Sequence, residues 1–532
     1  MRTRLTLFAL MILYAGLMAG CDKSGKAPET AKTESTAETR PETTTQTKAS
    51  PGIEWFKGSV DDAFAKAKSE HKPLFVYWGA VWCPPCEEVK NTVFKSEQFI
   101  ALTKLFIPVY IDGDSERAQA IGERFGVKGY PTMIVFNPAG KEITRIPGGI
   151  DISKYNSILQ LSLNRLRPTS ELVHLALTKP ETLQPPDFTQ LAYYSWDQDN
   201  DALPGDQPDT FFKDLSDAAA PHDKVAAARL YMEYLVQEAR KLKKNPKERV
   251  DGAYDALVKI FASNQLVLAC WDSLSYWPEI TNLVSDADRK MELEKLWQAR
   301  MMTLRHDPSI VPAEQLAAWL PLLHFHFEDS SKPLSRELDT ELEMDISEVN
   351  RSTDNPFARQ AVVDQIAYIY QKAKKTDEAK TVLLAELDKA AAPWYFMSDL
   401  GSLAEDAKQP AEAIKWYRDA YDTAKGPATR FQWGAAYVRS LIRLDPAKHQ
   451  LILDTAVHLF DEFPGPDDVF TGRNFRVLRS LSKKLDAWKT DSTSTELAKR
   501  FTARINELCG SEAEGTQARK NCESLESGGK TS

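Results

Sequence analysis

The feature that most constrains the fold is a pair of cysteines, Cys83 and Cys86, separated by two prolines. Residues 73–78, PLFVYW, form an apolar run of strand length, and residues 87–94, EEVKNTVF, have a helical pattern. The pair therefore lies where a strand passes into a helix. Cysteines at this spacing can form a structural disulfide, half of a metal site or a reversible redox pair.

The flanking residues predict a mixed α/β domain over residues 51–168. Apolar alternation and runs predict strands, and 3.6-residue periodicity predicts helices. Helical patterns cover residues 61–70, 87–94, 96–106, 116–126 and 151–166, and strand patterns cover residues 73–78, 106–112, 132–137 and 141–146. The turn Pro138-Ala139-Gly140 joins the last two strands as a hairpin. Strands that alternate with helices and end in a hairpin give a mixed sheet.

The motif WCPPC at residues 82–86, followed by GYPT at residues 129–132, resembles the thioredoxin family over residues 53–166. The resemblance implies that Cys83 and Cys86 are the catalytic pair. It also implies that Pro131 is a cis-proline against that pair, and that the backbone of Tyr130 pairs with an incoming peptide. The other motif residues implied at the active or substrate-binding site are Trp82, Pro84, Pro85 and Thr132.

Two positions depart from the thioredoxin pattern. Tyr77 occupies the position at which compact thioredoxins carry a buried acid. Glu87 occupies the position at which they often carry a lysine. The proton relay of the family therefore lacks its usual groups, and Asp112 or Glu88 would have to substitute.

The first turn of the predicted helix favours a reducing pair. A helix N-terminus lowers the pKa of a thiol placed there, as Cys83 is expected to be. Pro84 and Pro85 have no amide hydrogen, so the amide of Cys86 is the nearest donor left. Glu87, one helical turn after Cys83, opposes a thiolate. Weak stabilisation of the thiolate favours the disulfide, so we expect the pair to reduce other disulfides.

Two other roles for the pair stay open. A structural disulfide between cysteines two residues apart is one of them. A metal site would need two further ligands, and the sequence has no second CxxC and only scattered histidines. Transient copper binding by the reduced pair is the form that a metal role would take. The sequence predicts no resident metal and no cofactor.

The first residues have the pattern of a secretory leader. Two arginines precede an uncharged, mostly apolar run over residues 5–19, which is short for a membrane span. Residues 17–21, LMAGC, resemble a bacterial lipobox. This implies a signal peptide over residues 1–20 and lipid on Cys21, with an ordinary cleaved signal as the alternative. Asp22 resembles the signal for retention at the periplasmic face of the inner membrane.

Residues 21–50 are expected to be a disordered tether. After Cys21 they consist mainly of Thr, Glu, Lys, Ala and Ser, with no large apolar side chain. Such a segment cannot offset its ordering entropy by burying apolar surface. It would connect a lipid anchor to the folded chain.

Residues 169–508 predict an all-α domain. Ala379 and Ala413 are matched positions at a period of 34 residues, and this spacing resembles tetratricopeptide repeats. A general array of helical hairpins is the alternative. Such helices stack into a solenoid with a concave face for protein partners. The predicted fold is thus an α/β thioredoxin-like domain followed by a large helical-repeat domain.

The remaining cysteines and the net charge give further information on the compartment and on the class of function. Cys509 and Cys522 fall in a predicted C-terminal tail, residues 509–532, and are expected to form a structural disulfide in an oxidising compartment. Cys270 has apolar neighbours and is expected to be a buried, inert thiol. The formal net charge of −9 argues against nucleic-acid binding.

The sequence therefore predicts a membrane-anchored periplasmic thiol–disulfide oxidoreductase that reduces protein disulfides. A membrane thiol donor would supply its electrons, and the helical domain would dock protein partners. The alternative is a scaffold or assembly factor with an accessory thioredoxin-like domain.

Overall fold

The computed structural model describes residues 52–526, except residues 81–82, 116–117, 147–151, 165–166, 197–208, 243–248, 309, 311, 352–355, 464, 466–467 and 489–491. The predicted leader, Cys21 and the predicted tether up to residue 50 lie outside the described residues. Within the described part of the chain, no helix has the length and apolar character to cross a membrane.

A four-stranded mixed sheet forms the centre of the N-terminal domain, in the order β2-β1-β3-β4. Strand β1 (Leu74–Gly79) pairs in parallel with β2 (Ile107–Asp112) and antiparallel with β3 (Thr132–Phe136). The hairpin partner of β3 is β4 (Glu142–Ile146). The four strands lie where the sequence predicted them, and the predicted mixed α/β domain is confirmed.

Helices cover both faces of this sheet. They are α1 (Val60–Glu70), α2 (Pro84–Asn91), the 3-10 turn η1 (Val93–Lys95), α3 (Glu97–Thr103), α4 (Ala118–Arg124) and α5 (Ile152–Asn164). Alternate residues of β1 lie in different apolar clusters: Phe75 and Tyr77 in one, Val76 and Trp78 in the other. Because successive strand residues point to opposite faces, β1 is buried on both sides.

The rest of the chain is helical in its described part. Its α-helices are α6 (Thr169–Thr178), α7 (Pro185–Ala192), α8 (Phe211–Ala219), α9 (Lys224–Leu242), α10 (Ala253–Phe261), α11 (Asn264–Ala269), α12 (Trp271–Tyr276), α13 (Ala287–Leu304), α14 (Pro312–Ala317), α15 (Trp319–Asp329), α16 (Arg336–Arg351), α17 (Pro356–Lys372), α18 (Thr376–Glu386), α19 (Trp394–Asp406), α20 (Pro410–Thr423), α21 (Pro427–Leu444), α22 (His449–His458), α23 (Gly472–Trp488), α24 (Ser492–Ser511) and α25 (Gln517–Glu526). Short 3-10 helices are η2 (Pro180–Thr182), η3 (Pro278–Leu283) and η4 (Leu459–Glu462).

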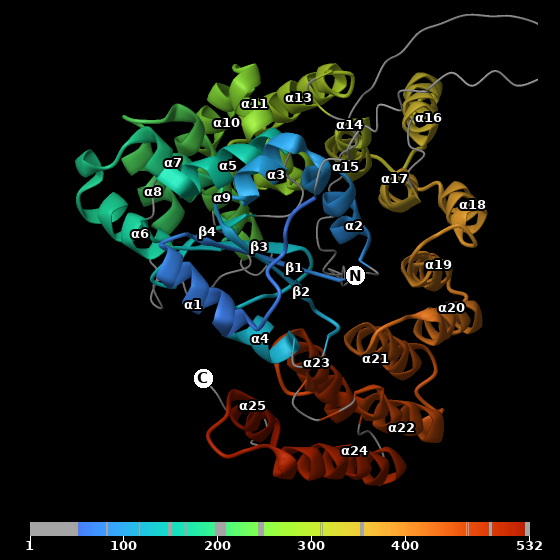
Figure 1. The fold of residues 1–532 in the computed structure, drawn as a ribbon. Helices are drawn as coiled ribbons and strands as arrows, with labels where there is room; N and C mark the ends of the chain where they lie inside the picture. The colour runs from blue at the N-terminus through green and yellow to red at the C-terminus, as the bar shows by residue number, and fades with distance from the viewer. Residues whose placement is uncertain are drawn as a thin grey trace, which may run out of the picture.

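Helices α16 to α24, residues 336–511, follow a curved path around the α/β domain (Figure 1) and are called the helical arc below. Helices α17, α19, α21 and α23 form its inner row, nearer the sheet. The anchor positions Ala379 and Ala413 are fully buried. The ring of Tyr417 lies so close to Gly401 that an added Cβ would be 3.0 Å from it. The solenoid architecture agrees with the sequence, and the assignment to tetratricopeptide repeats stays a prediction.

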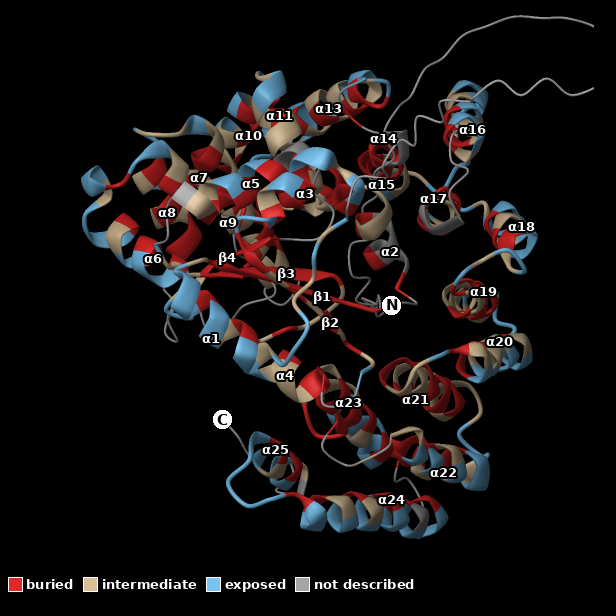
Figure 2. Cartoon of the chain, viewed as in Figure 1, coloured by how far each residue is buried: buried red, intermediate tan, exposed pale blue. Residues whose placement is uncertain are grey.

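Packing continues across the predicted domain boundary at residue 168. The side chains of Thr169 and Gln190 both donate hydrogen bonds to the carbonyl of Ile143 in β4, at 2.6 and 2.5 Å. The backbone amide of Ser195 donates to the carbonyl of Arg145, at 3.0 Å. Helices α6 and α7 therefore cover the outer strand of the sheet. Figure 2 shows that the central strands β1 and β3 are buried along their length and that much of the outer face of α24 is exposed.

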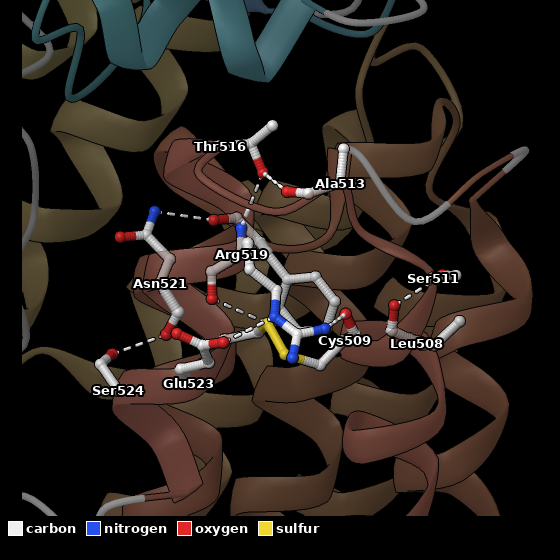
Figure 3. The surroundings of a disulfide bond; sticks show 11 residues. Leu508, Cys509, Ser511, Ala513, Thr516, Arg519, Asn521, Glu523 and Ser524 are labelled. Atoms are coloured by element: carbon white, nitrogen blue, oxygen red, sulfur yellow. Dashed lines mark hydrogen bonds and ion pairs between the residues drawn. A yellow bond between two sulfur atoms is a disulfide. The ribbon is translucent and has the colours of Figure 1, made fainter.

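The C-terminal residues differ from the predicted tail. Helix α24 runs through Cys509 to Ser511, and α25 follows after a short loop. Cys509 and Cys522 are bonded, with their Cα atoms 5.7 Å apart, and both are buried. The guanidinium of Arg519 donates to the carbonyl of Cys509 at 2.7 Å (Figure 3). The disulfide and this bond hold α25 against α24, so the segment up to residue 526 is a packed helix.

Candidate redox site

The end of strand β1 and the start of helix α2 bring the two cysteines together. Their sulfurs lie at bonding distance as a disulfide, and the Cα atoms are 5.2 Å apart. Cys83 is 2 % exposed and Cys86 is fully buried. Pro84 and Pro85 open α2, where a missing amide hydrogen costs nothing. Trp82 lies outside the described residues, as do the side chains of the two prolines.

The backbone of α2 supplies a donor to the first cysteine. The amide of Cys86 donates to the sulfur of Cys83, with 3.4 Å between nitrogen and sulfur. This is the donor that the two prolines were expected to leave. A hydrogen bond to a thiolate stabilises its charged form. The arrangement thus favours Cys83 as the thiolate that attacks, although the catalytic roles of the pair stay a prediction.

Tyr77 takes the place of the buried acid beneath the motif. Its hydroxyl donates to the carbonyl of Cys86 at 3.1 Å, and its side chain is fully buried. The ring stacks on Tyr110 and meets Phe94 edge-on, with centroids 5.5 and 4.7 Å away. A phenol in this position orients the first turn of α2.

Of the two acids that the sequence offered as substitutes, the structure describes the side chain of Asp112. The carboxylate of Asp112 accepts the amide of Asp114, at 3.1 Å, in the turn after β2. The side chain of Glu88 lies outside the described residues, as does that of Glu87.

The second motif, residues 129–132, lies next to the cysteine motif because β3 pairs with β1. The peptide bond between Tyr130 and Pro131 is cis, as the resemblance implied. Thr132 starts β3 opposite Trp78 of β1, so Pro131 lies beside the strand end that leads to the cysteines. Pro131 and Thr132 are buried, and the hydroxyl of Thr132 donates to the carbonyl of Gly129 at 2.9 Å.

Tyr130 joins this motif to the helical arc. Its ring stacks on Trp78, with centroids 6.1 Å apart, and its hydroxyl accepts a hydrogen bond from Gln119 at 2.9 Å. The guanidinium of Arg473 lies over the ring, 5.0 Å from its centroid. Burial raises the pKa of Tyr130, and the charge of Arg473 acts in the opposite direction. No sequence motif pointed to Arg473, which lies more than 300 residues beyond Tyr130.

The inner row of the arc brings carboxyl groups close to this region. Helix α17 packs against α2 (Figure 1) and carries Asp364. Burial, with a further contribution from the charge of Asp399, raises the pKa of Asp364 well above its usual value. Burial also raises the pKa of Asp399, on α19, to about 7. Burial thus favours the protonated form of both groups, which no local motif revealed.

The remaining candidate groups lie away from the pair. Burial raises the pKa of the Cys270 thiol to about 12, which agrees with the predicted inert thiol. Within the described residues, no three His, Cys, Asp or Glu side chains gather in a way that could hold a metal ion.

Part of this chain is similar to known proteins. Residues 60–162 match the family described as thioredoxin-like domain. Over 97 residues, 18 % of this chain, the sequence is 28 % identical to the thiol:disulfide interchange protein DsbD of Photorhabdus laumondii and spans 17 % of that protein. Over 85 residues, 16 % of this chain, it is 31 % identical to a thioredoxin H-type of Chlamydomonas reinhardtii and covers 72 % of it. A solved structure of a DsbH oxidoreductase aligns with 26 % of this chain and 96 % of its own, at 22 % identity and a TM-score of 0.20.

Proposed function

This chain belongs to the thioredoxin family, and from that premise we propose that it reduces disulfide bonds of exported proteins through Cys83 and Cys86. The observation that carries the proposal is the bonded cysteine pair at the start of α2, with the Cys86 amide directed at the Cys83 sulfur. A reversible pair needs this proximity, since each sulfur must reach the other when the disulfide reforms.

The reaction uses the two sulfurs in order. The Cys83 thiolate attacks one sulfur of a substrate disulfide, and the other substrate sulfur leaves as a thiolate. The Cys86 thiolate then attacks Cys83 in this mixed disulfide and releases the second substrate thiol. The substrate gains two electrons and the pair loses two as its own disulfide forms. A membrane thiol donor, the partner class that we propose, returns these electrons.

The reducing direction rests on how few groups stabilise the thiolate. The prolines leave the Cys86 amide as the nearest backbone donor, and Glu87 brings a negative charge one turn away in the sequence. A reduced form that is weakly stabilised makes the pair a reductant. We therefore expect a redox potential nearer to about −270 mV than to about −120 mV.

The proposed location is the periplasmic face of a bacterial inner membrane. The leader-like residues 1–20 and the lipobox-like stretch ending at Cys21 support it. Lipid on Cys21 and the tether up to residue 50 would keep the enzyme near a membrane thiol donor. Labelling with a fatty-acid analogue should be lost in Cys21→Ser, and that variant should become soluble. A Cys21→Ser protein that still carries label would refute the anchor.

The large helical domain supports a role in docking protein partners, as helical solenoids commonly do. The same feature supports the alternative, in which the chain is a scaffold or assembly factor. In that case the α/β domain that holds the cysteine pair, called the redox domain below, is an accessory.

Insulin reduction separates these two functions. The full chain should accelerate insulin reduction, and Cys83→Ala should abolish that activity, while Cys270→Ala should leave it unchanged. Equilibration of the Cys83–Cys86 pair with glutathione buffers then gives the redox potential. An inactive wild-type chain whose pair resists reduction would favour the scaffold.

A further inference from the structure

Helix α23 of the arc begins against the redox domain. The amide of Gly472 donates to a carboxylate oxygen of Glu123 at 2.6 Å, and the amide of Arg473 donates to the side-chain oxygen of Gln119 at 3.0 Å. The first amides of a helix have no partner within the helix and need one from outside. Two side chains of α4 supply these partners and fix where α23 starts.

Gln119 connects this helix start to Tyr130. Its side-chain nitrogen donates to the carbonyl of Gly113 at 2.8 Å and to the hydroxyl of Tyr130 at 2.9 Å. The residue is 3 % exposed, so these bonds are shielded from water. One buried amide group thus joins the start of α23, the turn after β2 and the Tyr130 ring.

Two arginines of α23 hold the loop that leads to Pro131. Arg473 lies over the ring of Tyr130, 5.0 Å from the centroid. Arg476, one turn further on, donates to the carbonyls of Val127 and Lys128 at 3.3 and 2.9 Å. Side chains of the arc therefore hold the loop at its start, residues 127–128, and at its end, Tyr130.

This loop leads into β3, and β3 pairs with β1, the strand that leads to the cysteine pair. Thr132 pairs with Trp78, and β1 ends one residue later at Gly79, four residues before Cys83. A shift of Tyr130 would therefore move Pro131 relative to the cysteines. Interactions that fix Tyr130 also fix one wall of the redox site.

We propose that α23 is part of the redox site, and that Arg473 and Arg476 are positioning residues that hold residues 127–131 in the form that accepts a substrate. This inference rests on the proposed function, because it assigns the helical domain a role in the same reaction. The arginines act through the loop and take no part in the exchange between sulfurs.

The test compares two arginines of one helix. Arg473→Met removes the charge over Tyr130, whereas the control Arg479→Met removes an exposed charge over Phe475, 5.7 Å away and outside the loop. The dithiol form of the full chain is mixed with rising insulin concentrations, and the half-saturating concentration and limiting rate are measured. The redox potential and thermal unfolding of each variant are measured alongside.

We expect Arg473→Met to raise the half-saturating concentration about tenfold, which corresponds to about 1.4 kcal/mol, with an unchanged redox potential. Arg473→Lys should recover most of this loss, and Arg479→Met should match the wild type. If Arg473→Met does not fold, Arg476→Met is used, with the same expected result.

Two results would overturn the inference. An active wild type with equal half-saturation for Arg473→Met and Arg479→Met would leave the proposed function intact and remove α23 from the site. An inactive wild type would overturn the function and this inference together.

Discussion

The carboxylate of Asp114 accepts a hydrogen bond from the amide of Ala428 at 3.1 Å, across 314 residues of sequence. The hydroxyl of Thr429 donates to the same carboxylate at 3.3 Å. Asp114 follows β2, and Ala428 lies in the first turn of α21, so the redox domain caps a helix of the arc. Gly426 before this helix has φ +86°, and a Cβ there would lie 2.3 Å from the Asp114 carboxylate. The approach of the two domains thus requires glycine at this position.

Asp114→Ala should destabilise the whole chain. The substitution leaves the first amides of α21 without their acceptor, and loss of a helix cap costs about 0.5–2 kcal/mol. Urea unfolding of the full chain measures the change. Asp388→Ala, which removes an exposed aspartate of the arc, should be neutral and serves as the control. Equal stability of the two variants would show that the contact between the domains does not contribute to folding.

Titration of Asp399 should make the free energy of unfolding depend on pH. Its pKa is raised to about 7 in the folded protein, against about 3.9 in an unfolded chain. Between these values the folded state holds a proton that the unfolded state has lost, so the free energy of unfolding falls as the pH rises. One such proton changes it by about 1.4 kcal/mol per pH unit. Burial raises the pKa of the neighbouring Asp364 as well, which acts in the same direction.

Urea unfolding between pH 5 and 8 tests this dependence. Asp399→Asn keeps the shape of the side chain without its titration, so the variant should lose part of the pH slope and exceed the wild type in stability above pH 7. The exposed Asp388→Asn should keep the slope of the wild type. A wild-type curve that is flat over this range would contradict the raised pKa.

The sequence predicted the α/β domain well because its signals are local. Apolar runs, turn residues and the two motifs each report on a few neighbours, and the strands begin and end within one or two residues of the predicted positions. The donor role of the Cys86 amide also followed from chemistry within one helical turn.

Contacts between distant segments left no such signal. Gln119, Glu123 and Arg473 are ordinary polar residues on helix surfaces until α4 and α23 are brought together. Tyr77 could be recognised as a departure from the family, but its bond to the Cys86 carbonyl needed the packed geometry. The residues predicted as a tail from 509 instead form the end of α24 and helix α25, which the disulfide to Cys522 and the Arg519 bond hold together.

Glu87→Lys should make the cysteine pair more oxidising. A positive charge near the start of α2 stabilises the Cys83 thiolate by about 0.3–1 kcal/mol. Since about 1.4 kcal/mol corresponds to 30 mV for a two-electron couple, the potential should rise by roughly 6–20 mV. Equilibration with glutathione buffers measures it. An unchanged or lower potential would show that this charge is too distant or too screened to act.

A fragment comprising residues 169–532 should be helical but less stable than the same helices in the full chain. The sequence predicts a separate all-α domain from residue 169, yet α21 and α23 would lose the acceptors that Asp114 and Glu123 provide. Two lost caps cost about 0.5–2 kcal/mol each. Circular dichroism during thermal unfolding measures the difference. A transition at the temperature of the full chain would show that the two domains are energetically independent.

Cys86→Ala should accumulate mixed disulfides in cells, and Cys83→Ala should not. The Cys86 amide favours Cys83 as the attacking thiolate, so loss of the Cys86 thiol leaves the adduct on Cys83 unresolved. Non-reducing gels of tagged protein, with and without dithiothreitol, reveal such adducts. Cys270→Ala should leave the adducts unchanged, because that thiol is buried and its pKa is about 12. Equal trapping by Cys83→Ala and Cys86→Ala would contradict the assigned order. If neither variant traps a protein while the wild type reduces insulin, small disulfides would become the better substrate class, since Cys83 is buried just before α2, the helix against which α17 packs.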